Sequence, residues 1–522
     1  MSNNFVKGAL LLTVATFLSK FLGSVFRIPL QNIAGDEVLG IFTLVYPVYM
    51  AVLIISVAGI PIAISKLISE ARVRNDVTAI RDIFVTSGIL AFSFGVVSFS
   101  FMYIFAEYIS LALGGLYAKP SIIIVAITLL VAPYMAVYRG FFQGFEIMKQ
   151  TAFSQVLEQF VRVGLILIIA YILVGQQSTN DIVAAGVMVG SSIGAFASLI
   201  YLRLSLQKTG LKPIAAQKYN FKAFKSWSKK ILLLSIPICV GALTMALLNF
   251  VDSVTIPSQL KNIGYIESEV TYLYGIYGRG LALVQIAVVF ASALILPLIP
   301  HITRSLSKGD INATKTTIEK AMKFTNLTSW PAGLGLVALI IPINLALFTN
   351  TEGSIVLAII CASALFTAIS ILTTGILQGI NRSNQAAYIV LASSIIKVIL
   401  NLILVEKFGL TGAAISTLIT YLILCGLNLY MINKHIRFTI FQRETAVHAF
   451  SSIIMGIIVG TPLLVLWSEN WTRLVALSYV MVMLAIGAVI YVSLVLLLKG
   501  ISKQELLTLP LVGGFIAKRM RG

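Results

Sequence analysis

Charged side chains inside long apolar stretches are the residues of this sequence that could do chemistry. Lys20, Arg27, Arg279 and Lys397 each lie in such a stretch with no acidic residue close by in sequence. Charged groups are costly in hydrocarbon, so they are expected to face a protein interior or a water-filled cavity. Arginine binds phosphate through two parallel hydrogen bonds and keeps its charge when it is desolvated. These cations therefore predict a cavity that binds an anionic substrate, for example a diphosphate.

Three further charged residues lie in apolar stretches. Glu158 and Arg162 are one helical turn apart, so they share a helix face and could form an ion pair that orients helices. Arg162 is also a candidate cavity cation. Asp252 is expected near the outer end of its span. It is either an interfacial residue or a member of an ion pair that takes part in coupling transport to the movement of an ion.

The composition indicates a membrane protein with many spans. Hydrophobic residues make up 58% of the chain, charged residues only 11%, and the mean hydropathy is +0.98. A bilayer-spanning helix needs roughly 20 mainly apolar residues, and the chain offers about fourteen such segments. The first apolar run continues past Lys20 without a convincing cleavage site, so it is interpreted as a retained helix rather than a signal peptide. The expected spans are 8–30, 38–64, 83–112, 121–143, 151–175, 182–205, 231–256, 271–300, 324–348, 354–379, 386–405, 410–432, 447–467 and 473–498.

The distribution of charge predicts the orientation of the chain in the membrane. The net charge is +19, and basic residues collect in alternate loops, including the segment 203–230, which holds no acidic residue. This is the positive-inside pattern, and it places both termini in the cytoplasm. The partner of the basic loops is therefore expected to be the anionic lipid surface rather than nucleic acid.

Cofactor and metal signatures are missing from the sequence. No phosphate-binding loop of the Walker type is present. Cys239, Cys361 and Cys425 have no metal-ligand spacing, and the histidines are too scattered for a zinc site. We expect no cofactor, no metal and no catalytic residue.

An internal repeat predicts the architecture. The run from Arg139, RGFFQGFEIMKQTAFSQVLEQFVRVGLILI, recurs without a gap from Thr374 as TGILQGINRSNQAAYIVLASSIIKVILNLI. In both copies an apolar helix ends in Gln-Gly, a short turn follows, and the next helix carries a cation, Arg162 or Lys397. A weaker match pairs SEARVRND from Ser69 with TRSLSKGD from Thr303. Such a repeat predicts two six-helix lobes in the same orientation, related by an axis along the membrane normal.

The repeat sets the expected domain boundaries. We expect an N-terminal lobe at 1–205, a basic cytoplasmic linker at 206–230, a C-terminal lobe at 231–432 and an additional helix pair with a basic tail at 433–522. The fold class is therefore all-α and polytopic. Helix breakers predict bends in the spans at Pro47, Pro61, Pro133, Gly275, Gly278 and Gly280.

Several motifs resemble one family of membrane exporters. The runs SKFLGSVFRIPLQNIAGD, VAGIPIAISKLISEA, YRGFFQG with SQVLEQFVRV, and YGRGLALVQ resemble the polysaccharide-biosynthesis flippases of Gram-positive bacteria. More narrowly, they are similar to the group of stage V sporulation protein B and MurJ-type lipid II flippases, in the multidrug/oligosaccharidyl-lipid/polysaccharide exporter superfamily. The likeness covers the first twelve expected spans.

The resemblance implies a function for the cavity. It implies alternating access that moves an undecaprenyl-diphosphate-linked cell-wall precursor, with lipid II as the expected cargo, from the inner to the outer leaflet of the bacterial cytoplasmic membrane. Lys20, Arg27 and Arg279 match the family's cavity-lining cations. Ile28 stands where Gram-negative relatives have an acidic residue, and their arginine-rich motif of the second span is absent.

Other functions stay open at the level of sequence. The cargo could be another lipid-linked glycan, such as a capsule or teichoic-acid unit. A cation-coupled multidrug exporter, a glycan polymerase using Asp252, Glu267 and Glu269, and a non-transporting scaffold are further alternatives. Short outer loops and the basic cavity candidates count against the exporter of cationic drugs and against the enzyme. The driving force is expected to be the membrane potential or a gradient of monovalent ions.

Overall fold

The computed structural model describes residues 3–57, 59–211, 218–440, 442–467 and 470–501, and over these ranges it contains helices and no strand. The prediction of an all-α polytopic membrane protein is therefore confirmed. Ten helical stretches in this part of the chain are long and apolar enough to cross a membrane. The number rises to eleven when the bent pair Ile311–Ala338 and Ile340–Phe348 is taken as one span.

Two of these stretches are much longer than one crossing requires. Leu11–Val73 has 63 residues and Ser383–His435 has 53, whereas about 20 residues cross a bilayer. Gly35 (φ 80°) and Gly409 (φ 55°) have non-helical backbone angles inside them, in the left-handed region that glycine adopts at no steric cost. Each stretch can therefore hold two crossings, and the total of about fourteen spans stays a prediction.

The helices fall into two compact units. Unit 1 comprises Met1–Val289 and Ser383–Thr420, and unit 2 comprises Phe290–Arg382 and Tyr421–Gly522. The predicted lobes 1–205 and 231–432, the linker 206–230 and the terminal pair 433–522 stay predictions, and residues 212–217 of that linker lie outside the described residues.

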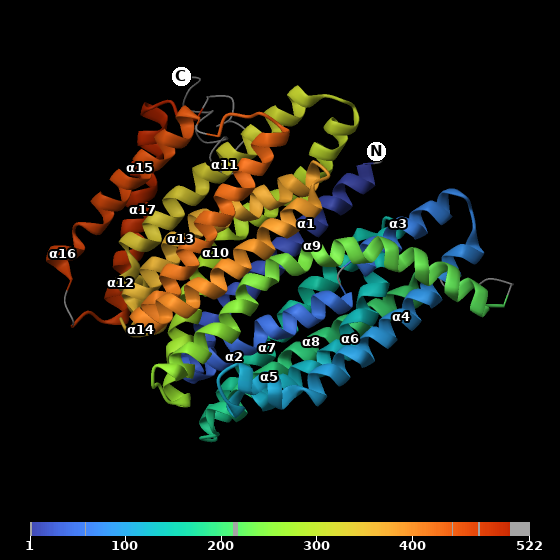
Figure 1. Ribbon diagram of the computed structural model, residues 1–522, viewed down its shortest axis with the longest axis horizontal. Helices are drawn as coiled ribbons and strands as arrows, with labels where there is room; N and C mark the ends of the chain where they lie inside the picture. The colour runs from blue at the N-terminus through green and yellow to red at the C-terminus, as the bar shows by residue number, and fades with distance from the viewer. Residues whose placement is uncertain (1–2, 58, 212–217, 441, 468–469, 502–522) are drawn as a thin grey trace. The chain divides into compact units, whose positions relative to one another are not determined.

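Unit 1 contains most of the candidate site. Its helices are α1 (Asn3–Val25), α2 (Arg27–Val57), α3 (Ile60–Val73), α4 (Val77–Ile104), α5 (Ala106–Ala112), the 3-10 turn η1 (Leu116–Ala118), α6 (Lys119–Gly144), α7 (Met148–Gly175), α8 (Asn180–Lys208) and α9 (Phe221–Asn262). It also holds α10 (Glu267–Ser307) as far as Val289 and α14 (Ser383–His435) as far as Thr420. Helices α4, α6, α7 and α8 lie side by side (Figure 1).

The apolar core of unit 1 is built around α2. Leu39 and Phe42 of α2 pack with Ile122 and Leu129 of α6 and Val187 of α8, all of them fully or almost fully buried. This core also encloses the buried polar side chains of α2 among apolar neighbours. Their charges must therefore be met inside the protein.

Unit 2 consists of helices from the C-terminal part of the chain. Its helices are α11 (Ile311–Ala338), α12 (Ile340–Phe348), α13 (Ser354–Gly379), α15 (Arg443–Gly460), α16 (Leu463–Leu466) and α17 (Arg473–Leu497), together with the remaining parts of α10 and α14. Helix α11 packs against α13 and α15, and α17 packs against α12 and α15. Helices α15 and α17 lie side by side in Figure 1.

The repeated runs have the same local structure. Helix α6 ends at Gly144 and α13 at Gly379, and each is followed by a residue with positive φ, Glu146 (63°) and Asn381 (61°). At the weaker match, Asp76 caps α4 by accepting from the Ala79 N–H, and Asp310 caps α11 in the same way from Ala313, both at 2.8 Å. Both copies thus use the same helix ends and the same side-chain caps, which supports the repeat.

Two glycines at which bends are predicted do not interrupt a helix. Gly275 and Gly278 belong to a continuous helix, α10, and their lack of a side chain instead lets α2 approach closely. The chain breaks at Phe26, between α1 and α2, and at Gly59 (φ 84°), which precedes α3. Arg27, predicted inside the first span, therefore begins the second helix.

Candidate substrate site

Arg279 is fully buried and pairs with Asp36 of α2. Its Nε donates to Asp36 Oδ1 at 2.6 Å, and Nη2 pairs with Oδ2. Gln31 Nε2 also donates to Oδ2, at 3.1 Å. No acidic residue lies close to Arg279 in sequence, and its acidic partner comes from a helix far away along the chain. Asp36, which the sequence places in an outer loop, is 5% exposed.

Glycines hold α2 and α10 close enough for this ion pair. A Cβ added at Gly40 would be 1.9 Å from the carbonyl oxygen of Thr271, and one at Gly275 would be 2.0 Å from that of Asp36. One at Gly278 would be 2.7 Å from Thr43 Oγ1. Small residues at membrane-helix crossings allow backbones to approach in this way. The glycines therefore position the Asp36 carboxylate against Arg279.

Lys397 is also fully buried and also paired. Its Nζ donates to Asp252 Oδ2 at 2.6 Å. The same carboxylate accepts from Asn401 Nδ2 at 3.0 Å and from the Tyr277 hydroxyl at 2.9 Å, and that hydroxyl lies 2.7 Å from Thr417 Oγ1. As with Arg279, the acidic partner of Lys397 is distant in sequence. The network joins α9, α10 and α14 inside unit 1.

Glu158 lies between two arginines. Arg162 Nη2 is 2.7 Å from Glu158 Oε1, and Arg139 Nη2 is 2.8 Å from Oε2. Arg139 also donates to Ser154 Oγ at 3.0 Å and to Ser198 Oγ at 3.2 Å. One carboxylate facing two guanidinium groups leaves a net positive charge between α6, α7 and α8.

A cavity of about 230 Å³ adjoins this cluster. Its polar lining includes Arg139, Glu158, Gln143 and Gln155, and Tyr49 of α2 lines it together with apolar residues. Arg139, which the sequence analysis does not single out as a site residue, lies near the C-terminal end of α6. The signal that could have found it is the arginine inside the apolar run YRGFFQG.

Arg27 differs from the other buried cations. It is 5% exposed at the start of α2, and among the described residues it has no ion pair and no hydrogen-bond partner for Nε. Its guanidinium carbon lies 6.0 Å from the centre of the Phe42 ring. Aromatic faces attract a cation only weakly at such a distance. The positive charge of Arg27 is thus not neutralised by an acid.

Lys20 belongs to α1, which packs against α7. Its side chain is exposed, and no ion pair is found for it in the part of the chain that the structure describes. The structure therefore brings Arg279 and Lys397 into two separate buried networks of unit 1 and puts Arg162 beside Glu158. Arg27 and Lys20 have no carboxylate partner within the described ranges. No group of three or more potential metal ligands occurs among the described residues.

Comparison with known proteins identifies relatives of the whole chain. An uncharacterized membrane protein of Bacillus subtilis, YabM, is 31% identical over 82% of this chain and 80% of its own. The lipid II flippase MurJ of the same organism is 27% identical over 88% of both chains. A solved structure of a lipid II flippase MurJ in an inward closed conformation matches with a TM-score of 0.66 and 18% identity, over 93% of this chain and 98% of that one.

The family model described as polysaccharide biosynthesis protein matches residues 5–306, more than half of the chain. That span contains Arg27, Asp36, the Glu158 cluster, Asp252 and Arg279. The predicted resemblance to the polysaccharide-biosynthesis flippases and their MurJ-type members is confirmed. The chain is a multi-pass membrane protein that belongs to the polysaccharide biosynthesis protein family.

Proposed function

We propose that this protein is a flippase that moves an undecaprenyl-diphosphate-linked cell-wall precursor, lipid II, from the inner to the outer leaflet of the bacterial cytoplasmic membrane. The protein works as a transporter by alternating access, with no catalytic residue and no cofactor. The membrane potential or a gradient of monovalent ions drives it. Both termini lie in the cytoplasm.

The observation that carries this proposal is the buried, unpaired Arg27. Keeping a guanidinium in an apolar interior without a carboxylate costs several kcal/mol. Such an arrangement is expected where the missing anion is the substrate. A diphosphate presents planar oxygen pairs that match the guanidinium fork. Arg27 is therefore assigned the role of binding the diphosphate of the cargo.

The other predicted site residues take different roles. Arg279 and Lys397 are neutralised by Asp36 and Asp252, so they position helices rather than bind the diphosphate directly. The cluster of Arg139, Glu158 and Arg162 keeps one uncompensated positive charge beside a polar cavity, which makes it a second anion-binding position. Lys20 is assigned to the entry of the anion, because its exposed ammonium lies on the helix that precedes Arg27.

The relatives support the class of cargo. MurJ of Bacillus subtilis is by name a lipid II flippase, and it resembles this chain over most of both lengths. Lipid II carries a diphosphate between its lipid and its sugars, which fits the unpaired cation. The proposal that lipid II is the cargo rests on the similarity to MurJ and on the match between the diphosphate and Arg27.

The test is rescue of lipid II transport in the native host. The host is depleted of this protein and of its paralogues, and lipid II is labelled separately in each membrane leaflet. Wild type should restore lipid II in the outer leaflet, Arg27→Ala should fail at equal membrane abundance, and Arg27→Lys should restore part of the activity. Arg74→Ala, which removes an exposed arginine at the end of α3, is the matched control and should rescue fully.

Two outcomes would contradict parts of the proposal. Full rescue by Arg27→Ala would remove Arg27 from the substrate site. A normal leaflet distribution of lipid II after depletion would show that another polyprenyl-linked glycan, such as a capsule or teichoic-acid precursor, is the cargo.

A further inference from the structure

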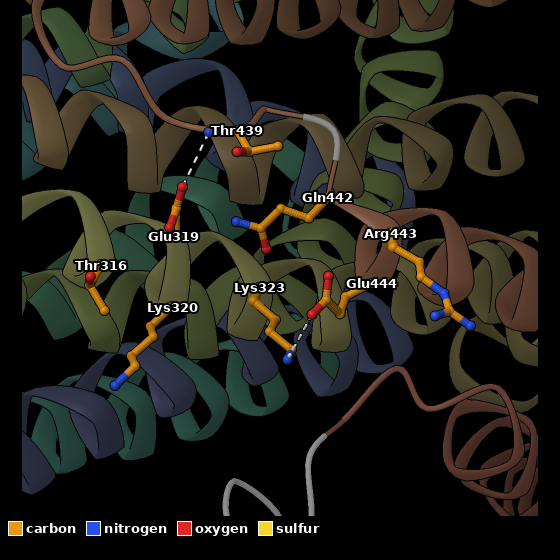
Figure 2. A pocket seen from close by; sticks show the side chains of 8 residues that line it. All are labelled: Thr316, Glu319, Lys320, Lys323, Thr439, Gln442, Arg443 and Glu444. Carbon is orange, nitrogen blue, oxygen red and sulfur yellow. Dashed lines mark hydrogen bonds and ion pairs between the residues drawn. The ribbon is translucent and has the colours of Figure 1, made fainter. Parts of the chain in front are cut away.

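A second pocket lies in unit 2, away from the residues assigned to the cargo. It has a volume of about 470 Å³ and is lined by residues of α11, of the segment between α14 and α15, and of the first turn of α15. Figure 2 shows these side chains, with Glu319 beside Thr439, Lys323 beside Glu444, and Lys320 and Arg443 extending outward on opposite sides. All of its charged lining residues belong to one unit, so the pocket is a feature of unit 2 alone.

The acidic residues of this pocket are already engaged. Glu319 Oε1 accepts from the backbone N–H of Thr439 at 3.2 Å, and Glu444 Oε1 lies 3.4 Å from Lys323 Nζ. Both contacts are drawn as dashed lines in Figure 2. The carboxylates therefore fix the pocket wall and do not leave it acidic.

Two cations of the pocket are not paired. Lys320 and Arg443 are exposed, and neither makes an ion pair with any residue that the structure describes. In Figure 2 their side chains extend from the wall without a contact to another residue drawn. The N-terminus of α15 adds a positive partial charge, because Gln442 makes no side-chain cap there. The pocket thus carries a net positive charge of about one unit at neutral pH, concentrated in these two side chains.

The position of the pocket along α15 points to a membrane lipid. Arg443 begins the stretch Arg443–Leu466, which is apolar enough to cross a membrane. Only 22% of its most apolar 18-residue segment is buried inside the protein. On the same helix Phe450, Ile453 and Ile457 are exposed and follow Arg443 at helical spacing, so they form one apolar stripe below the arginine. A cation at the head of an exposed apolar stripe matches an anionic headgroup with its acyl chain.

We infer that this pocket binds the phosphate headgroup of an anionic phospholipid, with an acyl chain along Phe450, Ile453 and Ile457. Basic pockets between membrane helices on the cytoplasmic side are suited to such headgroups. The lipid is a bound component of the membrane rather than cargo. The inference therefore does not depend on what the protein transports.

The experiment uses the purified full chain and phosphatidylglycerol as the probe. Native mass spectrometry measures the affinity for phosphatidylglycerol of wild type and of the double variant Lys320→Gln/Arg443→Gln. Each cation near a membrane surface contributes about 1 kcal/mol, so the double variant should bind the lipid roughly thirty-fold more weakly. The charge-conserving variant Lys320→Arg/Arg443→Lys should bind like wild type, which separates lost charge from misfolding.

The matched control is Lys308→Gln/Arg437→Gln. These residues are exposed cations of the same unit that do not line the pocket, and their replacement changes the net charge by the same amount. The control should retain the affinity of wild type. An equal loss in the control, or unchanged binding by the Lys320/Arg443 variant, would overturn the site. Displacement of the lipid by an equimolar amount of inorganic phosphate would overturn the assignment to a lipid and indicate a free-phosphate site.

Discussion

At the scale of single residues, a carboxylate from a distant helix decides what each buried cation does. Arg279 and Lys397 each have an acid within hydrogen-bond distance, and Arg27 has none among the residues that the structure describes. A paired cation is held in one place and has little charge left for a ligand, whereas an unpaired one gains most from an incoming anion. The three cations look alike in sequence but differ in this respect.

The Arg279–Asp36 ion pair can be tested by comparing the stabilities of single and double variants. Arg279→Gln leaves the Asp36 carboxylate buried without its cation and should lower the free energy of unfolding by about 3–5 kcal/mol. The double variant Asp36→Asn/Arg279→Gln removes both charges and should recover most of that loss. The measurement is denaturant unfolding of the purified protein in detergent. Losses that simply add in the double variant would show that the two side chains are not coupled.

The Asp252 network predicts a smaller effect. Tyr277→Phe removes the hydroxyl that donates to Asp252 and keeps the ring, so unfolding should become easier by about 1.5–3 kcal/mol, the range for a hydrogen bond to a charged group. Tyr103→Phe removes an exposed hydroxyl and should leave stability unchanged. Equal stability of the two variants would mean that Tyr277 does not support the Asp252 carboxylate.

At the scale of elements, the crossing of α2 and α10 positions the site. Gly40, Gly275 and Gly278 bring the two backbones into contact, and the ion pair forms where they meet. Interruptions of the helices also position the charged groups of the site. The interruption at Phe26 starts α2 at Arg27, and Gly35 turns the chain next to Asp36. Both charged groups of α2 that belong to the site therefore lie at helix irregularities.

The crossing makes a prediction for Gly40→Ala. Its new Cβ would lie 1.9 Å from a backbone carbonyl oxygen, so α2 and α10 must separate and the Arg279–Asp36 pair must lengthen. We expect a stability loss of about 3 kcal/mol or more, since overpacking alone costs 1–3. Gly164→Ala in α7 is the control, because nothing lies within 4 Å of its Cβ position, and alanine favours a helix by about 1 kcal/mol over glycine. Thermal unfolding of both variants measures the difference, and equal melting temperatures would contradict the close crossing.

At the scale of the whole molecule, the orientation in the membrane follows from the basic loops. The segment after α8 carries many lysines, whereas the turn before it, around Gln177, carries none. Basic loops stay on the cytoplasmic side. The two ends of α8 are thus expected on opposite sides of the membrane, with Lys208 inside.

Cysteine labelling checks this orientation. In a chain whose Cys239, Cys361 and Cys425 are replaced by alanine, Gln177→Cys should react with a membrane-impermeant thiol reagent in intact cells. Lys208→Cys should react only after the membrane is opened. Both positions are exposed, so the difference reports the side of the membrane. The opposite pattern would reverse the orientation of the protein.

The sequence by itself determined the class of protein and its helices. Apolar runs separated by charged loops are sufficient to predict a polytopic helical membrane protein, because a bilayer leaves helices as one of the few structures that satisfy every backbone group. The repeat and the charges inside spans are also visible in the sequence, since each depends on residue types and spacing along the chain. Even the pair of Glu158 with Arg162 follows from spacing along one helix.

Only the tertiary structure decided which cations are neutralised. Asp36 and Arg279 are joined across α2 and α10, and Asp252 and Lys397 across α9 and α14; no local pattern encodes such contacts. The repeat even suggested equivalent roles for Arg162 and Lys397, yet their acids come from different helices of the fold. Charge pairing depends on distances of a few ångströms between helices, and those distances are set by packing at residues such as Gly40 and Gly275. For this reason the cations can be recognised in the sequence, whereas the packing of the helices decides that Arg27 is buried with no acid beside it in the described part of the chain.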